Sequence, residues 1–176
     1  MQDSFGRTID YLRLSVTERC DLRCRYCMEE SGVPKRTHTE MLRLEELAEI
    51  GEAAVALGVR KIRLTGGEPL VRRGLLTLCR SLSALPGLEE LCLTPTGTQL
   101  KAFAAPLRAA GVSRLNISLD TLQPEKFTCL TRRGNLQDTL DGIAAAEAAG
   151  FDRLKLNCVL MGGVNDDEIG DFLRLT

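Results

Sequence analysis

A phrase of seven residues recurs four times in the chain and restricts the fold more than any other feature. Each copy reads glycine, an apolar residue, two mostly polar residues, an apolar residue, a variable residue and an apolar residue, at 58–64, 87–93, 111–117 and 150–156. A helix-like stretch precedes each copy, and glycine readily takes the left-handed conformation that ends a helix. Helix, capping glycine and short strand in repetition predict a βα architecture with a parallel sheet.

The repeat and the surrounding periodicity place the elements. Strands are expected near 11–16, 61–65, 90–94, 114–118 and 153–158, and helices near 43–57, 73–84, 98–110, 136–149 and 166–175. About five βα units cannot close an eight-stranded barrel. The predicted fold is therefore α/β, an open, partial TIM-like barrel, with residues 1–176 forming one domain.

Alternate residues of a strand face opposite sides of a sheet, so the repeat also predicts two faces. Its apolar positions should pack against the helices. The opposite face would carry one layer of Arg13, Arg63, Cys92, Asn116 and Lys155, and a second of Ser15, Thr65, Thr94, Ser118 and Asn157. These residues could instead face solvent on a half-covered sheet. Because converging cations are costly without an anion, we expect this face to bind a multiply anionic ligand such as a nucleotide polyphosphate.

Composition excludes several classes of protein. The formal net charge of −1 gives no overall basic field for nucleic acid. No apolar run reaches the ~18 residues of a membrane span, and the first residues lack a signal-like apolar segment, so a cytoplasmic location without membrane contact is expected. Seven cysteines in a chain of 176 residues without secreted features argue against a disulfide framework.

Cys20, Cys24 and Cys27 form a C-x-x-x-C-x-x-C motif directly after the first expected strand. Three thiolates leave one position of a four-ligand metal group open for chemistry. The alternative is a zinc-stabilised binding module, with His38 or Cys129 as the fourth ligand. Closed zinc sites usually use repeated C-x-x-C pairs, so a reactive iron–sulfur cluster is favoured.

The segment 13–27, with an aromatic residue just before the last cysteine, resembles the radical S-adenosylmethionine (SAM) superfamily. Thr65-Gly-Gly-Glu-Pro69 is similar to that family's motif for the amino group of SAM. Segments 3–7, 61–72, 115–122, 155–157 and 163–168 resemble, in order, the GTP 3′,8-cyclase family of molybdenum cofactor biosynthesis. The resemblance covers essentially the whole chain.

The resemblance implies a set of ligands and site residues. It assigns a 4Fe–4S cluster to Cys20, Cys24 and Cys27, SAM to Tyr26, Gly66, Gly67, Glu68 and Ser118, and GTP to Arg13, Arg63, Thr94 and Lys155. It further implies reductive cleavage of SAM to a 5′-deoxyadenosyl radical, which abstracts the C3′ hydrogen of GTP before C8 is attacked. An electron donor such as flavodoxin or ferredoxin is implied, and a homodimer is left open.

Two departures from the family pattern bear on these expectations. The chain has Thr94-Pro-Thr-Gly97 where the family has Thr-Thr-Asn-Gly, and Pro95 lacks a backbone donor. The family's second 4Fe–4S cluster belongs to a C-terminal part beyond Thr176, so this chain alone is expected to be inactive with GTP. Another radical SAM enzyme, such as a peptide-modifying maturase, is the main alternative. Arg72-Arg73 and Arg132-Arg133 are expected to be solvated, and 166–168 to start a helix.

Overall fold

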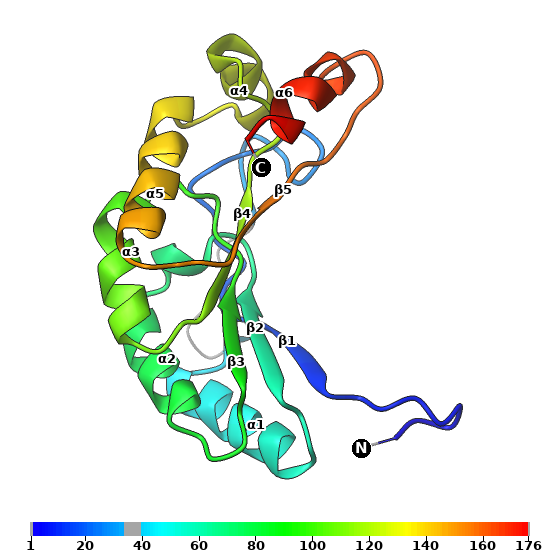
Figure 1. Ribbon diagram of the computed structural model, residues 1–176, viewed down its shortest axis with the longest axis vertical. Coiled ribbons are helices and arrows are strands. Elements are labelled where there is room, and N and C mark those ends of the chain that lie inside the picture. Colours follow the sequence, from blue (N-terminus) through cyan, green and yellow to red (C-terminus); the bar gives the residue numbers. More distant parts are fainter. Residues whose placement is uncertain (1, 34–39, 176) are drawn as a thin grey trace.

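The computed structural model describes residues 2–33 and 40–175; His38, the candidate zinc ligand, lies outside them. Five parallel strands form one open sheet in the order of the chain. The strands are β1 (Tyr11–Ser15), β2 (Lys61–Thr65), β3 (Glu90–Leu93), β4 (Arg114–Ser118) and β5 (Leu154–Asn157). All five predicted strands and the open, partial barrel are thus confirmed (Figure 1).

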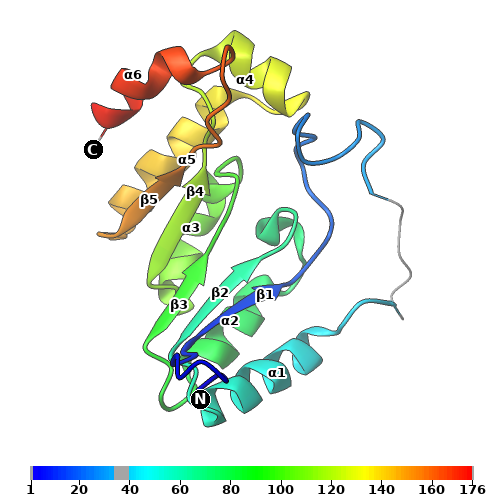
Figure 2. The same ribbon diagram turned by 90° about the vertical axis from the view of Figure 1, so that its right-hand side faces the viewer.

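Helices α1 (Leu44–Ala56), α2 (Leu75–Ser83), α3 (Leu100–Ala109) and α5 (Leu136–Ala148) cover one side of the sheet and leave the other side open (Figure 1). Helix α4 (Pro124–Thr131), which the periodicity did not predict, lies at the carboxyl ends of the strands with α6 (Ile169–Leu173) (Figure 2). The helix expected at 166–175 is a 3₁₀ turn, Asp166–Glu168, followed by α6. No helix among the described residues is long and apolar enough to cross a lipid bilayer.

The apolar positions of the repeat form the core, as the sequence predicted. Ile62 and Leu64 of β2 are fully buried, and their equivalents in β3 and β4 are nearly so. They belong to one cluster with leucines of the covering helices, including Leu47, Leu78 and Leu107. Each such side chain contributes about 1.5–3 kcal/mol when removed from water. The buried stripe therefore fixes which face of every strand turns toward the helices.

The strand register corrects the predicted layers on the opposite face. Arg13 pairs with Arg63, and Arg63 with Cys92, as expected. Cys92, however, pairs with Arg114, so Asn116 lies one layer further along the strands, together with its partner Lys155. The repeat would align Leu93 with Ile117, but Leu93 pairs with Leu115. A shift of two residues keeps every side chain on its face, and such stagger accompanies the curling of a sheet toward a barrel.

Candidate active site at the carboxyl ends of the strands

The three-cysteine motif lies in the loop after β1, which we call the cysteine loop (residues 17–28). Cys20 and Cys24 are partly buried, Cys27 is exposed, and all three thiols are free. The amides of Cys27 and Met28 both donate to the Cys24 carbonyl, at 2.9 and 3.1 Å, which winds the loop around Cys24. Within residues 2–33 and 40–175, no three His, Cys, Asp or Glu side chains are gathered as ligands of a metal ion.

The donor chemistry of the cysteine loop nevertheless fits an iron–sulfur cluster. Burial raises the pKa of the Cys20 thiol to about 12 and that of Cys24 to about 11. The charge of Cys24 adds to the first shift and that of Cys27 to the second. Sulfur ligands select soft metals and clusters, and a coordinated thiol is held deprotonated by the metal. The cysteine loop therefore supplies three free thiols within residues 20–27, and the charged forms of Cys20 and Cys24 need a cation beside them.

The Gly66-Gly67 pair holds the start of the cysteine loop against the end of β2. The Gly67 amide donates to the Thr17 carbonyl, and the Glu68 amide to the Arg19 carbonyl, both at 2.8 Å. Gly66 has φ +142°, and a Cβ at position 67 would lie 2.2 Å from the Arg19 oxygen. The family resemblance assigned these glycines to the motif for the amino group of SAM. Contacts within the chain also require them.

Glu68 connects the ends of β2 and β3. Its side chain is fully buried, and its two carboxylate oxygens accept hydrogen bonds from the amides of Leu70 (2.9 Å) and Thr96 (2.6 Å). Burial raises the pKa of Glu68 to about 7, although both amide donors oppose that shift. The carboxylate is therefore occupied inside the protein, between two loops that border the candidate site.

Side chains fasten the middle of the cysteine loop to the neighbouring strand ends. Asp21 accepts hydrogen bonds from the hydroxyl of Thr98 (2.6 Å) and the side-chain amide of Gln99 (3.1 Å), which follow β3. The Tyr26 hydroxyl donates to Asp120, which follows β4, at 2.5 Å. Burial and the Asp120 hydrogen bond raise the pKa of Tyr26, so its phenol stays a donor. Sequence periodicity carried no signal for either contact.

Helix α4 and the residue after it hold the outer side of the cysteine loop. The amides of Arg23 and Arg25 donate to the carbonyls of Thr131 and Leu130, each at 2.9 Å. The Arg132 guanidinium donates to the carbonyls of Arg23 and Met28, each at 3.1 Å. The expectation that Arg132 is merely solvated was therefore wrong. Arg132 is the C-terminal cap of α4, with φ +57°.

The remaining predicted SAM contact, Ser118, ends β4 and is partly buried. Its amide donates to the Pro95 carbonyl at 3.0 Å, while the Thr94 amide donates to the Leu64 carbonyl at 3.1 Å. Pro95 therefore contributes its carbonyl to the strand ends where its nitrogen cannot donate. Tyr26, Gly67 and Ser118 all lie on loops or strand ends at the carboxyl edge of the sheet.

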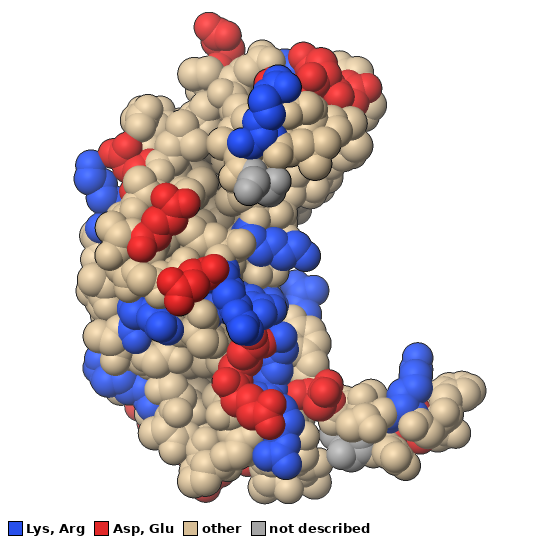
Figure 3. Space-filling model, in the orientation of Figure 1, with Lys and Arg blue, Asp and Glu red and all other residues tan. Residues whose placement is uncertain are grey.

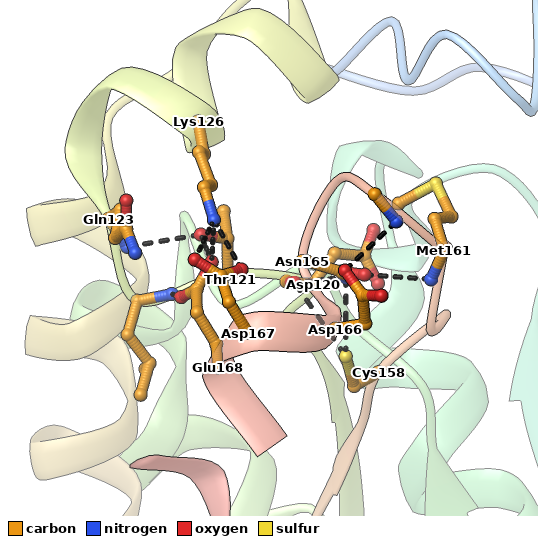
Figure 4. A network of polar contacts seen from close by, with 12 residues as sticks. Asp120, Thr121, Gln123, Lys126, Cys158, Met161, Asn165, Asp166, Asp167 and Glu168 are labelled. Atoms are coloured by element: carbon orange, nitrogen blue, oxygen red, sulfur yellow. Dashed lines mark hydrogen bonds and ion pairs between the residues drawn. The ribbon is translucent and has the colours of Figure 1, made fainter. Parts of the chain in front are cut away.

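A polar network fixes the loop after β5 to the loop after β4 (Figure 4). Glu168, almost completely buried, accepts hydrogen bonds from the Thr121 hydroxyl (2.7 Å) and the Leu122 amide (2.6 Å), and pairs with Lys126 (3.2 Å). The Asn165 side-chain amide donates to the Asp120 carbonyl at 2.6 Å. The segment 163–168 is thus a structural latch, a role that its acidic composition alone did not indicate.

The open face of the sheet carries a cavity of about 650 Å³. Figure 3 shows basic and acidic side chains side by side along this hollowed flank. The lining residues are Asp10, Tyr11, Arg13, Arg60, Lys61, Arg63, Glu89, Glu90, Thr94, Asn116 and Asn157. Arg13, Arg63 and Thr94, three of the four residues expected to bind GTP, therefore share one cavity. The fourth, Lys155, is exposed and lines a separate, mainly apolar cavity between β5, α5 and α6.

The basic side chains at this cavity have two kinds of partner. Glu90 forms ion pairs with Lys61, with Arg114 (3.0 Å) and with Arg153 (3.7 Å), and the hydrogen bond from Lys61 contributes most to lowering the pKa of Glu90. Arg63 instead donates to two neutral hydroxyls, those of Tyr11 (2.8 Å) and Thr94 (3.2 Å). Neither of these two hydrogen bonds goes to a carboxylate. An anion that enters the cavity would therefore replace a neutral hydroxyl at Arg63.

A half-barrel of parallel strands with a three-cysteine loop and a Gly-Gly turn at its carboxyl edge defines the class of protein. The family profile of the Radical SAM superfamily matches residues 14–176, and the chain belongs to that superfamily. The GTP 3′,8-cyclase of Peptoclostridium acidaminophilum is 55% identical over 174 residues, and that of Pseudomonas entomophila is 59% identical. These alignments cover 99% and 98% of this chain but 54% and 51% of the relatives, so the chain spans about half their length.

Solved structures support the fold. Methylornithine synthase superposes with a TM-score of 0.72 at 19% identity, over 94% of this chain and 48% of that one. Streptococcus suis SuiB superposes with a TM-score of 0.74 at 17% identity, over 94% of this chain and 36% of that one. At such identities the likeness concerns the fold alone.

Proposed function

We propose that residues 1–176 form the radical SAM core domain of a GTP 3′,8-cyclase, acting in molybdenum cofactor biosynthesis. The observation that carries the proposal is the convergence of Arg13, Arg63 and Thr94 in one cavity, on the sheet whose carboxyl edge carries the cysteine loop. The cyclases that are 55–59% identical to this chain support the same substrate.

The proposed roles follow from charge and position. Cys20, Cys24 and Cys27 would hold a 4Fe–4S cluster, and Tyr26, Gly66, Gly67, Glu68 and Ser118 would border SAM. Such a cluster, when reduced with SAM bound, supplies a carbon radical able to abstract hydrogen. Arg13 and Arg63 would hold the triphosphate by charge-assisted hydrogen bonds, with Thr94 beside them and Lys155 further along the strands. Their task is to orient the ribose so that its C3′ hydrogen meets the radical.

The nucleotide part of the proposal is tested by binding. The chain should bind GTP at least tenfold more tightly than guanosine, because the cations recognise the phosphates. Arg63→Ala should remove most of that difference. The matched control is Arg80→Ala, since Arg80 lies on the covering helix α2, away from the cavity. Equal binding of GTP and guanosine by the unaltered chain would contradict the proposal.

The radical part is tested separately. Anaerobically reconstituted chain is mixed with SAM and dithionite, and 5′-deoxyadenosine is measured. We expect formation of 5′-deoxyadenosine that Cys24→Ala abolishes. Conversion of GTP is a further assay, in which we expect this chain alone to be inactive; the electron donor of the reaction is proposed to be a flavodoxin or ferredoxin. Metal and sulfide analysis addresses the zinc-module alternative, because zinc without sulfide would reject the radical chemistry.

A peptide-modifying radical SAM enzyme is the second candidate. Its support is the fold shared with SuiB, a protein whose crystal structure bound to a precursor peptide is known. Such an enzyme would need the cysteine loop and the Gly-Gly turn but not the convergence of Arg13 and Arg63. Tight binding of GTP with loss in Arg63→Ala therefore separates the two candidates.

A further inference from the structure

Asp120 joins three loops at the carboxyl edge of the sheet. It follows β4, and its side chain is 7% exposed. One carboxylate oxygen accepts the hydrogen bond from Tyr26 of the cysteine loop at 2.5 Å, and the other accepts from the amide of Val159, after β5, at 2.8 Å. Its backbone carbonyl accepts from Asn165 at 2.6 Å. Among the described residues, no Lys or Arg forms an ion pair with Asp120.

We propose that Asp120 is a positioning residue of the radical SAM site, which sets the place of the cysteine loop by holding the Tyr26 side chain. Tyr26 stands between Cys24 and Cys27, so a tether on its hydroxyl acts on both thiols. The Val159 bond ties the same carboxylate to the neighbouring loop. The inference rests on the proposed SAM contact at Tyr26, which it deepens.

The local packing explains why this bond would matter more than an ordinary surface contact. A nearly buried carboxylate must be compensated by donors, and here the Tyr26 hydroxyl and the Val159 amide take that role. The bond is therefore present whenever the loop is in place. By contrast, the Cys27 side chain is exposed, so it is positioned chiefly through the backbone on either side of it.

The variants separate the hydrogen bond from the charge. Tyr26→Phe keeps the ring and removes the tether, and Asp120→Ala removes both side-chain acceptors. Asp120→Asn loses the charge but can keep both bonds, because its oxygen can accept from Val159 while its amide donates to the Tyr26 oxygen. Asp152→Asn, an exposed position before β5, is the matched control for loss of one charge.

The first measurement needs no cluster. Hydrogen–deuterium exchange of the metal-free chain should become at least fivefold faster at residues 24–28 in Tyr26→Phe and Asp120→Ala. Asp120→Asn should stay within twofold of the unaltered chain, and combining Tyr26→Phe with Asp120→Ala should add little to either alone. Unchanged exchange in Tyr26→Phe, which keeps the fold intact, would overturn the proposal.

The second measurement reports on the site. In reconstituted protein the SAM concentration that half-converts the electron paramagnetic resonance signal of the reduced cluster should rise at least fivefold in Tyr26→Phe and Asp120→Ala. Asp120→Asn should restore it. An Asn variant as impaired as Ala would show that the charge, not the tether, is required and would refute positioning. If the unaltered chain takes up no iron, the proposed function fails, whereas the exchange experiment still decides the role of Asp120.

Discussion

At the scale of single residues, backbone space at the strand ends decides whether the cysteine loop can lie where it does. Gly66 adopts a backbone conformation that residues with a side chain rarely take. At Gly67 a Cβ would lie 2.2 Å from the carbonyl oxygen of Arg19. Two amide–carbonyl bonds, from Gly67 and Glu68, depend on that approach. In the sequence the same two glycines were assigned only by their resemblance to the motif for the amino group of SAM.

Gly67→Ala should therefore destabilise the chain. The added Cβ would lie 2.2 Å from the Arg19 oxygen, so backbone must move, at a cost of about 1–3 kcal/mol. Urea unfolding should show this loss, and iron uptake should fall with it. Gly162→Ala is the matched control, because nothing lies within 4 Å of a Cβ there. Equal unfolding midpoints for the two variants would contradict the steric argument.

Glu68 should make stability depend on pH. Burial raises its pKa in the folded chain to about 7, from a model-compound value of 4.5. The folded state then binds more protons than the unfolded state between these values, so the stabilising effect, complete below pH 4.5, is lost as pH rises through 7. The unfolding midpoint should decline more between pH 5 and 8 than in Glu68→Gln. Parallel pH profiles for the two proteins would show that Glu68 is already ionised when folded.

At the scale of elements, the sequence predicted what depends on local periodicity. The repeated glycine phrase located the strands, and its apolar positions located the buried face, because both follow from the period of two in a strand. Helix α4 was missed because a second helix, α5, follows it, and not a copy of the repeat. The stagger between β3 and β4 was missed as well. Gly87 and Gly111 begin their copies of the repeat in the same way whether Leu93 pairs with Leu115 or with Ile117, so the repeat does not specify the register of the two strands.

The residues of the candidate site likewise divide into those that local periodicity predicts and those that it does not. Arg13 and Arg63 could be assigned to one face because each stands between two apolar residues of its strand that face the helices, Leu12 and Leu14 in β1 and Ile62 and Leu64 in β2. The contacts of Asp21, Asp120 and Arg132 with their partners join segments about 77 to 109 residues apart. Such contacts depend on how loops meet at the sheet edge. That arrangement cannot be predicted from the local periodicity of a single sequence.

The latch of 163–168 makes its own prediction. Glu168→Gln should destabilise the chain by about 2 kcal/mol, because a buried carboxylate with three partners loses its charge. Asp167→Asn, at the neighbouring exposed position that pairs with the same Lys126, should change stability by less than about 1 kcal/mol. Urea denaturation of the two variants measures the difference. A larger loss of stability in Asp167→Asn than in Glu168→Gln would show that Asp167, and not Glu168, holds the segment 163–168 in place.

At the scale of the whole molecule, the sheet is covered on one side, and within residues 2–33 and 40–175 the edge strand β5 pairs with β4 alone. Beside that edge lies an apolar cavity of about 960 Å³, lined by residues of β5, α5 and α6 such as Leu156, Leu140 and Phe172. An unpaired strand edge next to apolar surface is a site of association. The described chain thus combines an ordered core with an exposed edge, formed by β5 and the neighbouring apolar cavity, that favours association.

Self-association of the chain should therefore occur through the β5 edge and the apolar cavity beside it. Sedimentation of the chain should show reversible growth of the mean mass with concentration, and Leu160→Lys should reduce it because Leu160 is exposed beside the cavity. Leu57→Lys changes an equally exposed leucine at the end of α1 and should leave the association unchanged. Equal effects of both substitutions would indicate general solubility instead of a defined surface.

The neutral partners of Arg63 have a consequence for kinetics. Lys61, Arg114 and Arg153 meet a carboxylate at Glu90, so an anion that recruits them must compete with an existing ion pair. At Arg63 an arriving anion exchanges only with the hydroxyls of Tyr11 and Thr94. Capture there does not require an existing ion pair to be replaced, and because the attraction is between charges its rate should fall with ionic strength.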